Sequence, residues 1–241
     1  MKLKKFRDEH QQFIAEGDKL IRDLISGNFQ IHEIFATNKW LEKNTLPKTI
    51  IINEITEEEL NRISQLSTPN QVLAVAKYQK TEIHYNEIFN NLTLMLDEIK
   101  DPGNMGTIIR IADWFGISNI ICSEDTVDTY NPKVVQSTMG SIARVNIYYT
   151  NLAELLKKTP ENTPVFGTLL TGKNIYEQDL SKNGIIIVGN ESRGISDDLL
   201  KYITNKLYIP SYAQNTDNKA ESLNASIATA IICAEFKRKF N

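Results

Sequence analysis

Residues 92–110, LTLMLDEIKDPGNMGTIIR, predict the local structure from which the fold can be inferred. The first five residues are almost entirely apolar, which is typical of a strand covered on both faces. Pro102-Gly103-Asn104 predicts a turn. The residues that follow have helical apolar spacing, and the expected buried stripe is Met105, Ile108, Ile109 and Ala112. A strand, a turn and a helix in this order indicate an α/β fold.

The same alternation continues to the end of the chain. Apolar runs predict strands at 92–96, 119–122, 145–149, 165–170, 185–188 and 207–209, and helical patterns predict helices at 105–115, 132–142, 152–158, 197–203 and 221–240. Short apolar strands separated by helices are typical of a mostly parallel sheet with helices on both faces. We therefore expect residues 92–241 to form one such α/β domain.

The front of the chain predicts a second, smaller α/β unit over residues 1–76. A helix is expected over 12–26 and another over 56–66, where Thr56 and Glu59 have the spacing of a capping box. Strands are expected at 32–36, 49–52 and 72–77. Residues 77–91 are polar and lack a clear period, so they are interpreted as a linker between the two domains.

Composition excludes several classes of protein. The 241 residues carry 27 basic and 30 acidic side chains, a formal charge of −3, which excludes a strongly basic nucleic-acid binder of the histone kind. Basic clusters at the two chain ends, including Lys4, Lys5 and Arg7 at the first, are either solvated or contact phosphate. The 41 % hydrophobic and 24 % charged residues are typical of a folded domain.

Cysteines, histidines and apolar runs predict neither a metal site nor a membrane anchor. The two cysteines form no C-x-x-C pair and the three histidines share no motif, so we expect a reduced, cytoplasmic protein without a metal site. No apolar run approaches the roughly 20 residues that a membrane span requires. The basic N-terminus is not followed by the apolar stretch of a signal peptide.

Ligands of open parallel sheets bind beyond the carboxyl ends of the strands, so the loops there are the candidate site. The first loop, within 97–110, matches neither G-x-G-x-x-G nor a Walker motif, which argues against nicotinamide and nucleoside-triphosphate cofactors. Arg110 is expected to point away from the core. It either forms an ion pair with Asp113 on the helix surface or binds a phosphate or carboxylate through its planar guanidinium group.

Two further loops combine glycine with polar residues. In GIIIVGNESRG, residues 184–194, Gly189 permits close approach of a ligand, and Glu191 either holds a turn or takes part in chemistry. The third loop, 207–224, precedes a helix rich in small residues. Its apolar stripe at Leu223, Ile227, Ile231 and Ala234 permits close packing within the domain or across a dimer. Packing does not explain Glu221-Ser222 and Asn224 at the start of that helix.

Together the three loops resemble the three motifs of the SpoU/TrmH-type RNA methyltransferases of the SPOUT superfamily. The matching residues are Asp101–Gly106 with Arg110 and Phe115-Gly116, then Gly189-Asn190-Glu191 with Gly194, then Ile209-Pro210 and Glu221–Ser226. The resemblance covers residues 92–241. Residues 1–76 also resemble the RNA substrate-binding domain often found in front of it, which is similar to certain RNA-binding ribosomal proteins, with Glu16-Gly17-Asp18-Lys19 in the usual place.

The resemblance implies transfer of a methyl group from S-adenosylmethionine to a ribose 2′-hydroxyl in structured RNA, with 23S-type ribosomal RNA favoured over transfer RNA. It also implies a deep C-terminal trefoil knot and a homodimer with the active site near the subunit interface. The implied catalytic residues are Asn104, Arg110, Glu191, Ser222 and Asn224. The implied cofactor-binding residues are Thr168, Leu169, Leu170, Gly189, Ile209, Leu223 and Asn224.

An arginine is a poor base, because its pKa exceeds about 12 in proteins. Arg110 is therefore expected to bind RNA phosphate and to stabilise the developing alkoxide, while the phosphate or water takes the proton. The segment 211–221 is longer than the family's usual loop. Two alternatives remain: a non-catalytic RNA-binding or ribosome-assembly protein on the same fold, and an unrelated doubly wound enzyme for a small phosphorylated substrate.

Overall fold

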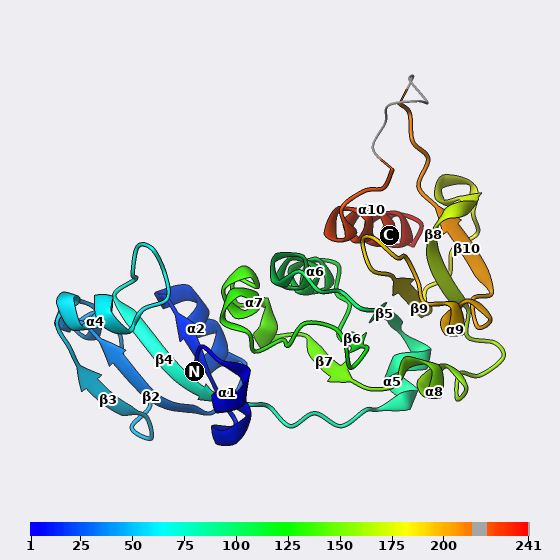
Figure 1. The fold of residues 1–241 in the computed structure, drawn as a ribbon. Helices are drawn as coiled ribbons and strands as arrows, with labels where there is room; N and C mark the ends of the chain where they lie inside the picture. The colour runs from blue at the N-terminus through cyan, green and yellow to red at the C-terminus, as the bar shows by residue number, and fades with distance from the viewer. Residues whose placement is uncertain (214–220, 241) are drawn as a thin grey trace. The chain divides into compact units, whose positions relative to one another are not determined.

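The computed structural model describes residues 1–213 and 221–240, which fall into two compact units (Figure 1). The first unit consists of residues 1–80 together with 128–144, and the second consists of 81–127 together with 145–241. Most of the long segment 211–221 that the sequence singles out lies outside the described residues.

The first unit is built on a four-stranded sheet with the strand order β1-β4-β2-β3. β4 runs antiparallel to both β1 and β2, and β2 runs parallel to β3. The strands are β1 (Gln12–Glu16), β2 (Ile31–Ala36), β3 (Ile51–Glu54) and β4 (Val72–Lys77), and the helices from the same stretch are α1 (Lys4–His10), α2 (Asp18–Ser26), α3 (Asn38–Leu41) and α4 (Glu57–Ile63). The capping box is confirmed, since Thr56 Oγ1 accepts a hydrogen bond from Glu59 N and Thr56 N donates to Glu59 Oε2.

The single helix expected over 12–26 is wrong. Residues 12–16 form β1, and the helix begins only at Asp18. The break falls at Gly17, whose φ of +101° is a backbone conformation that favours glycine. β1 forms because it pairs with β4, some sixty residues away, and such a long-range contact leaves no local signal.

Residues 128–144 pack with the first unit, although the sequence places them in the second domain. They contain α7 (Pro132–Ser137) and a short 3₁₀ turn, η1 (Ser141–Ala143). The ring of Tyr130 stacks between those of Phe13 and Tyr78, with centroid distances of 4.7 and 4.1 Å. Burial raises the pKa of the Tyr130 hydroxyl to about 12, so this group stays protonated at neutral pH.

The helix expected over 132–142 therefore ends early. It stops at Ser137, and the next turn contains Met139 and Gly140 with φ values of +51° and +98°, which no helix accommodates. The side chain of Arg7, which the sequence counts in a basic cluster, is 2 % exposed and forms an ion pair of 2.6 Å with Asp128. Arg7 is thus part of the core of the first unit and is unavailable to phosphate.

The second unit contains a six-stranded sheet in which every pair is parallel, with the order β10-β8-β9-β5-β6-β7. This confirms the predicted parallel α/β sheet. The strands are β5 (Leu92–Leu96), β6 (Asn119–Cys122), β7 (Asn146–Tyr149), β8 (Val165–Asn174), β9 (Gly184–Val188) and β10 (Asn205–Tyr208). The helical segments are α5 (Tyr85–Asn90), α6 (Pro102–Trp114), α8 (Leu152–Leu156), η2 (Ile175–Glu177), α9 (Asp197–Leu200) and α10 (Ala225–Arg238).

Helices cover both faces of this sheet. α6 and α10 lie side by side on one face (Figure 1), and the predicted buried stripe of α6 is confirmed. α5, α8 and α9 pack on the other face around Met95, Ile121 and Ile187. α5 occupies part of the expected linker, where its Ile88 and Phe89 join this core. None of the described helices is long and apolar enough to cross a bilayer.

The apolar stripe predicted for the last helix, expected to pack within the domain or across a dimer, faces outward from the domain. α10 begins at Ala225, later than expected, and buries Thr229, Ile232 and Phe236, the last in edge-to-face contact with Phe166 at 4.9 Å. Ile227 is 52 % exposed, and Ala234 is exposed as well. The predicted stripe of small and apolar residues therefore forms the outer face of the helix.

The ion pair between Arg7 and Asp128 predicts a large effect on stability. Asp128→Ala leaves a buried guanidinium without its counter-charge, which should lower the free energy of unfolding by about 3–5 kcal/mol. Urea unfolding followed by circular dichroism measures this loss. The matched control is Glu58→Ala, which breaks the exposed pair with Arg62 and should change stability little. Equal effects of the two substitutions would contradict this account.

Candidate active site

Three loops of the second unit meet at the carboxyl edge of its sheet through one side chain, that of Asn104. Its Nδ2 donates a hydrogen bond to Glu191 Oε1 at 2.5 Å. Its Oδ1 accepts one from Asn224 Nδ2 at 2.8 Å. The structure therefore brings together three of the five predicted catalytic residues, one from each predicted motif.

The loop from β5 to α6 is fixed before it reaches Asn104. Asp97, buried at the end of β5, accepts hydrogen bonds from Ser196 N and Oγ at 2.7 and 2.6 Å. Asp101 caps α6 by accepting from the backbone N–H of Asn104 at 2.8 Å. Pro102 occupies the first turn, where a missing N–H costs nothing. Asn104 is thus held by its backbone, and its side chain is left to bridge the other loops.

The loop after β9 is a tight turn with Glu191 next to its start. The backbones of Asn190 and Gly194 exchange two hydrogen bonds of 2.9 Å, and Asn190 Oδ1 accepts from the backbone N–H groups of residues 192 and 193. A Cβ on Gly189 would lie 2.3 Å from the carbonyl carbon of Gly194. Only glycine fits there, because the backbone of the turn fills the space.

Asn224 serves two purposes at the start of α10. Its Oδ1 caps the helix by accepting from Ser226 N, Ser226 Oγ and Ile227 N. Its Nδ2 makes the bond to Asn104. Ser222 and Leu223 precede the helix and are exposed, and Ser222 makes no hydrogen bond within the described part of the chain.

Arg110 lies on the exposed face of α6 and, among the described residues, makes no hydrogen bond to the other predicted catalytic residues. Within residues 1–213 and 221–240 it forms no hydrogen bond or ion pair, so the alternative pair with Asp113 is absent. Its five N–H donors are free for an anion from outside the chain.

The predicted cofactor-binding residues of β8 lie where the sheet is irregular. The ladder with β9 ends at Gly167, and the ladder with β10 skips from Gly167 to Lys173. Thr168, Leu169 and Leu170 therefore have no paired residue in either ladder. Leu170 and Leu223 are 67 % and 46 % exposed, and Ile209 directly follows β10. Backbone outside the ladders and exposed apolar side chains are compatible with an adenine ring, so these residues fit the cofactor.

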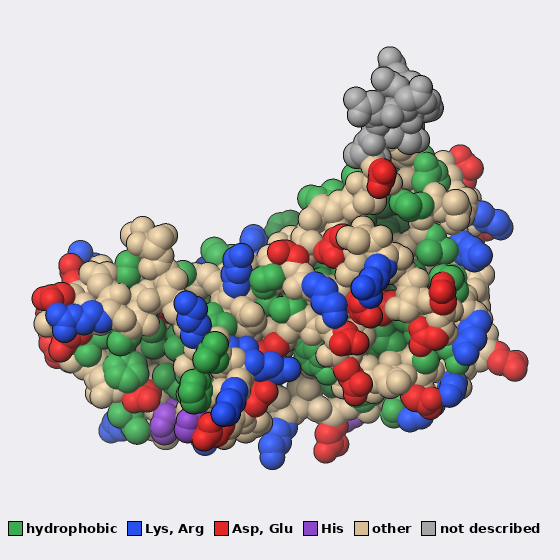
Figure 2. Space-filling view, in the orientation of Figure 1, with side chains coloured by type: hydrophobic (Ala, Val, Ile, Leu, Met, Phe, Trp, Pro, Cys, Tyr) green, Lys and Arg blue, Asp and Glu red, His purple; other side chains and the backbone are tan. Residues whose placement is uncertain are grey.

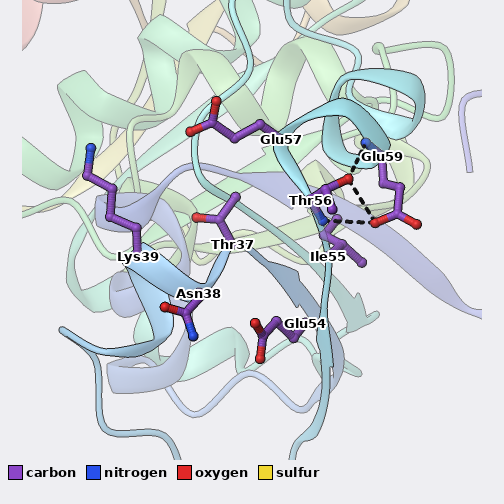
Figure 3. A pocket seen from close by; sticks show the side chains of 8 residues that line it. All are labelled: Thr37, Asn38, Lys39, Glu54, Ile55, Thr56, Glu57 and Glu59. Carbon is purple, nitrogen blue, oxygen red and sulfur yellow. Dashed lines mark hydrogen bonds between the residues drawn. The ribbon is translucent and has the colours of Figure 1, made fainter.

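Two hollows in the described structure do not include the hydrogen-bonded Asn104, Glu191 and Asn224, although the second borders the site at Asp97 and Ser196. One, of about 540 Å³ in the first unit, is lined by Thr37, Asn38, Lys39, Glu54, Ile55, Thr56, Glu57 and Glu59 (Figure 3). Glu59 is committed to the capping box there. The other, of about 210 Å³ in the second unit, includes Asp97, Glu124 and Asp198. Neither is lined by Asn104, Arg110, Glu191 or Asn224, and both carry more acidic than basic groups.

Some residues of the site were not predicted. Asp97 with Ser196 and Asn190 with the carbonyl of Glu98 tie the first two loops together. Arg193 lies 3.7 Å from Glu98. In the sequence, the one feature that could have indicated these contacts is the position of Asp97 directly after a buried strand. Among the described residues, no group of three or more histidine, cysteine or acidic side chains is arranged to hold a metal ion.

An open parallel sheet with a polar site built from three loops at its carboxyl edge defines an α/β enzyme of the doubly wound class. The comparisons with known proteins then identify the family. Residues 91–234 match the model of the SpoU rRNA methylase family, and residues 1–74 match the MRM3-like substrate binding domain. The chain belongs to the SpoU rRNA methylase family.

Relatives share nearly the whole chain. The 23S rRNA (guanosine(2553)-2′-O)-methyltransferase RlmP of Bacillus subtilis is 29 % identical over 231 residues, 95 % of this chain and 90 % of the relative. A solved TrmH-family protein from Porphyromonas gingivalis, described as a putative RNA methyltransferase, has a TM-score of 0.89 and 34 % identity, covering 99 % and 94 % of the two chains. An AdoMet-bound rRNA methyltransferase from Sinorhizobium meliloti has a TM-score of 0.86 and 29 % identity, covering 100 % and 92 %.

Proposed function

We propose that this protein methylates a ribose 2′-hydroxyl of 23S-type ribosomal RNA. It is an S-adenosylmethionine-dependent RNA (ribose-2′-O)-methyltransferase. The observation that carries the proposal is the joining of Asn104, Glu191 and Asn224 by direct hydrogen bonds, because this assembles the three family motifs into one site. The RlmP relative is named for 23S rRNA, which supports ribosomal over transfer RNA.

Each part of the chain has a proposed role. Residues 1–76 recognise the RNA, residues 77–91 link the two domains, and residues 92–241 catalyse the methyl transfer. The family resemblance supports a deep C-terminal trefoil knot in the second part and a ribosomal-protein-like fold in the first. We place the protein in the cytoplasm, where ribosomal RNA of this type is modified. The intact site argues against the alternative of a non-catalytic RNA-binding or ribosome-assembly protein.

The site residues have three proposed roles, and Asn224 shares two of them. Arg110 binds a phosphate of the RNA and stabilises negative charge as it develops on the 2′-oxygen. Asn104, Glu191, Ser222 and Asn224 shape the site around the ribose. Thr168, Leu169, Leu170, Gly189, Ile209, Leu223 and Asn224 hold the cofactor, which supplies an electrophilic methyl group on a sulfonium.

A net charge of −3 is consistent with RNA binding through local contacts. Basic and acidic side chains are interspersed over the face drawn in Figure 2, without a broad field of one sign. Arg110 has a free guanidinium in the described structure, so a single well-placed cation contributes to binding alongside this mixed surface. This predicts a shallow dependence of RNA affinity on salt.

The outer face of α10 and the end of α6 support a homodimer. Trp114 is 85 % exposed at the C-terminus of α6, and Ile227 with Ala234 forms an apolar face on the neighbouring α10. Exposed apolar residues of this size mark interaction surfaces. We propose that a second copy of the chain covers them, which also brings a second RNA-binding unit to the assembly.

The Arg110 side chain predicts a separation of binding from chemistry. Arg110→Ala should lower methyl transfer by about 10²–10³-fold, as is typical for the loss of one group that stabilises transition-state charge. Affinity for S-adenosylmethionine should stay within about twofold. Methyl-labelled cofactor and unmodified ribosomal RNA provide the assay, and alkali-resistant dinucleotides identify a 2′-O-methyl group. The matched control is Arg62→Ala, an exposed arginine of α4.

Label in a base, or unchanged methylation by Arg110→Ala, would contradict these roles. Cofactor binding by the wild-type protein without methylation of any ribosomal or transfer RNA would favour the non-catalytic alternative.

The exposed Trp114 predicts the oligomeric state. The wild-type protein should sediment as a dimer, and Trp114→Glu should shift it toward the monomer, because a charge cannot be buried there without a partner. Analytical ultracentrifugation measures both. A wild-type monomer at micromolar concentration would overturn the dimer.

A further inference from the structure

The orientation of both asparagine amides in the site is fixed by their partners. Asn224 Oδ1 accepts three hydrogen bonds at the start of α10, so its Nδ2 must point to Asn104. Asn104 Oδ1 therefore accepts, and its Nδ2 must donate to Glu191. Turning either amide round would place two acceptors or two donors against each other.

These bonds form a directed chain from a helix end to a carboxylate. It begins at the N-terminus of the fourteen-residue α10, where the helix dipole is positive. It passes through Asn224 and Asn104 and ends on Glu191 Oε1, and each hydrogen bond polarises the next. The chain both orients the carboxylate and supports negative charge on it.

One carboxylate oxygen of Glu191, Oε2, is not used by the hydrogen-bonded chain. Both amide oxygens of the chain are used, and Glu191 Oε1 is bonded to Asn104. Within the described residues, Glu191 Oε2 has no hydrogen-bond partner, and the side chain is only partly buried. A ribose hydroxyl entering the site thus finds a carboxylate oxygen that can accept its hydrogen bond.

Resting on the proposed function, we propose that Glu191 Oε2 accepts the proton of the ribose 2′-hydroxyl, and that Asn104 and Asn224 are positioning residues acting through Glu191. Arg110 cannot take this proton, because a guanidinium stays charged in proteins. A carboxylate side chain can act as a general base.

The step balances in atoms and charge. The 2′-oxygen forms a bond to the methyl carbon while the bond from that carbon to sulfur breaks and its electron pair stays on sulfur. The proton of the 2′-hydroxyl passes to Glu191 Oε2. A sulfonium and a carboxylate are thereby converted to a neutral thioether and a carboxylic acid.

The charged groups on the segments that meet at Glu191 come from four elements. They are Asp97, Glu98, Lys100 and Asp101 in the loop after β5, Arg110 and Asp113 on α6, Arg193 on the loop of Glu191 itself, and Glu221 before α10. Glu98 is already shared by Arg193 and Lys100, at 3.7 and 3.9 Å. Within the part of the chain that the structure describes, none of these charged groups is hydrogen-bonded to the Glu191 carboxylate and Asn104 is, so changes to the hydrogen-bonded chain act on it directly.

Glu191→Gln tests the proton acceptor. It keeps the shape and the bond from Asn104 but removes the base, so kcat should fall by about 10²–10⁴-fold, the usual contribution of general-base catalysis. The KM for RNA and the affinity for S-adenosylmethionine should change less than about threefold. The acidic limb of the wild-type pH profile of kcat should disappear. Retention of kcat, or of that limb, would overturn the proposal.

Asn224→Asp tests the chain separately from the helix cap. Aspartate caps helices as well as asparagine does, but it cannot donate to Asn104, whose amide must then turn its oxygen toward Glu191. We expect an unchanged melting temperature, a kcat about tenfold lower, and an acidic limb moved to higher pH, because the carboxylate loses its donor. The matched control is Asn151→Asp, which makes the same substitution at the cap of α8 and should leave all three unchanged.

Side-chain amide NMR of the free protein supplies a readout without turnover. The Asn104 Nδ2 protons should shift in both Glu191→Gln and Asn224→Asp, and not in Asn151→Asp. Unmoved Asn104 protons, or a pH profile that Asn224→Asp leaves in place, would overturn the chain. A wild-type protein that methylates no RNA would overturn the proposed function and the proton transfer, while the spectra would still decide whether the chain of hydrogen bonds exists.

Discussion

The side-chain amide of Asn104 is the interaction on which the candidate site depends. Residues 104, 191 and 224 come from three loops that are distant in the sequence, and one amide joins the last two by donating to Glu191 and accepting from Asn224. A side-chain amide can do both, because it has a donor NH₂ on one side and an acceptor oxygen on the other. An aspartate at position 104 would place its carboxylate against that of Glu191. An alanine there would remove the hydrogen-bond partner of both Glu191 and Asn224.

The sheet explains why the loops meet there. β9 pairs in parallel with β5, with Val188 opposite Leu96, so the two loops leave the sheet side by side. Asp97 then binds the backbone and hydroxyl of Ser196, and Asn190 binds the carbonyl of Glu98. α10 packs against α6 on the same face, which brings Asn224 to Asn104. The order of the strands thus determines which loops can share a ligand, and buried polar contacts set their separation.

Much of this was predictable from local patterns, and the rest required long-range contacts. The apolar runs gave β5 and β6 at their observed bounds, since buried parallel strands have a strong local signature. The helix expected over 12–26 was wrong because β1 exists only through its pairing with β4. The small residues of α10 left open whether its stripe packs within the domain or across a dimer, and the structure places Ile227 and Ala234 on the outer face. The motifs identified Asn104, Glu191 and Asn224 but not the direction of the bonds between them, which depends on which oxygen the helix cap occupies.

The account makes Asn224 and Glu191 act as one unit although they do not touch, and a double-mutant cycle in kcat tests this most directly. Asn224→Asp and Glu191→Gln are measured singly and together, with cofactor affinity and melting temperature as controls. If Asn224 acts through Glu191, Asn224→Asp should have almost no further effect once Glu191 is glutamine, so the two losses are strongly non-additive. If the two losses multiply, the residues work independently and the hydrogen-bonded chain through Asn104 has no part in the reaction.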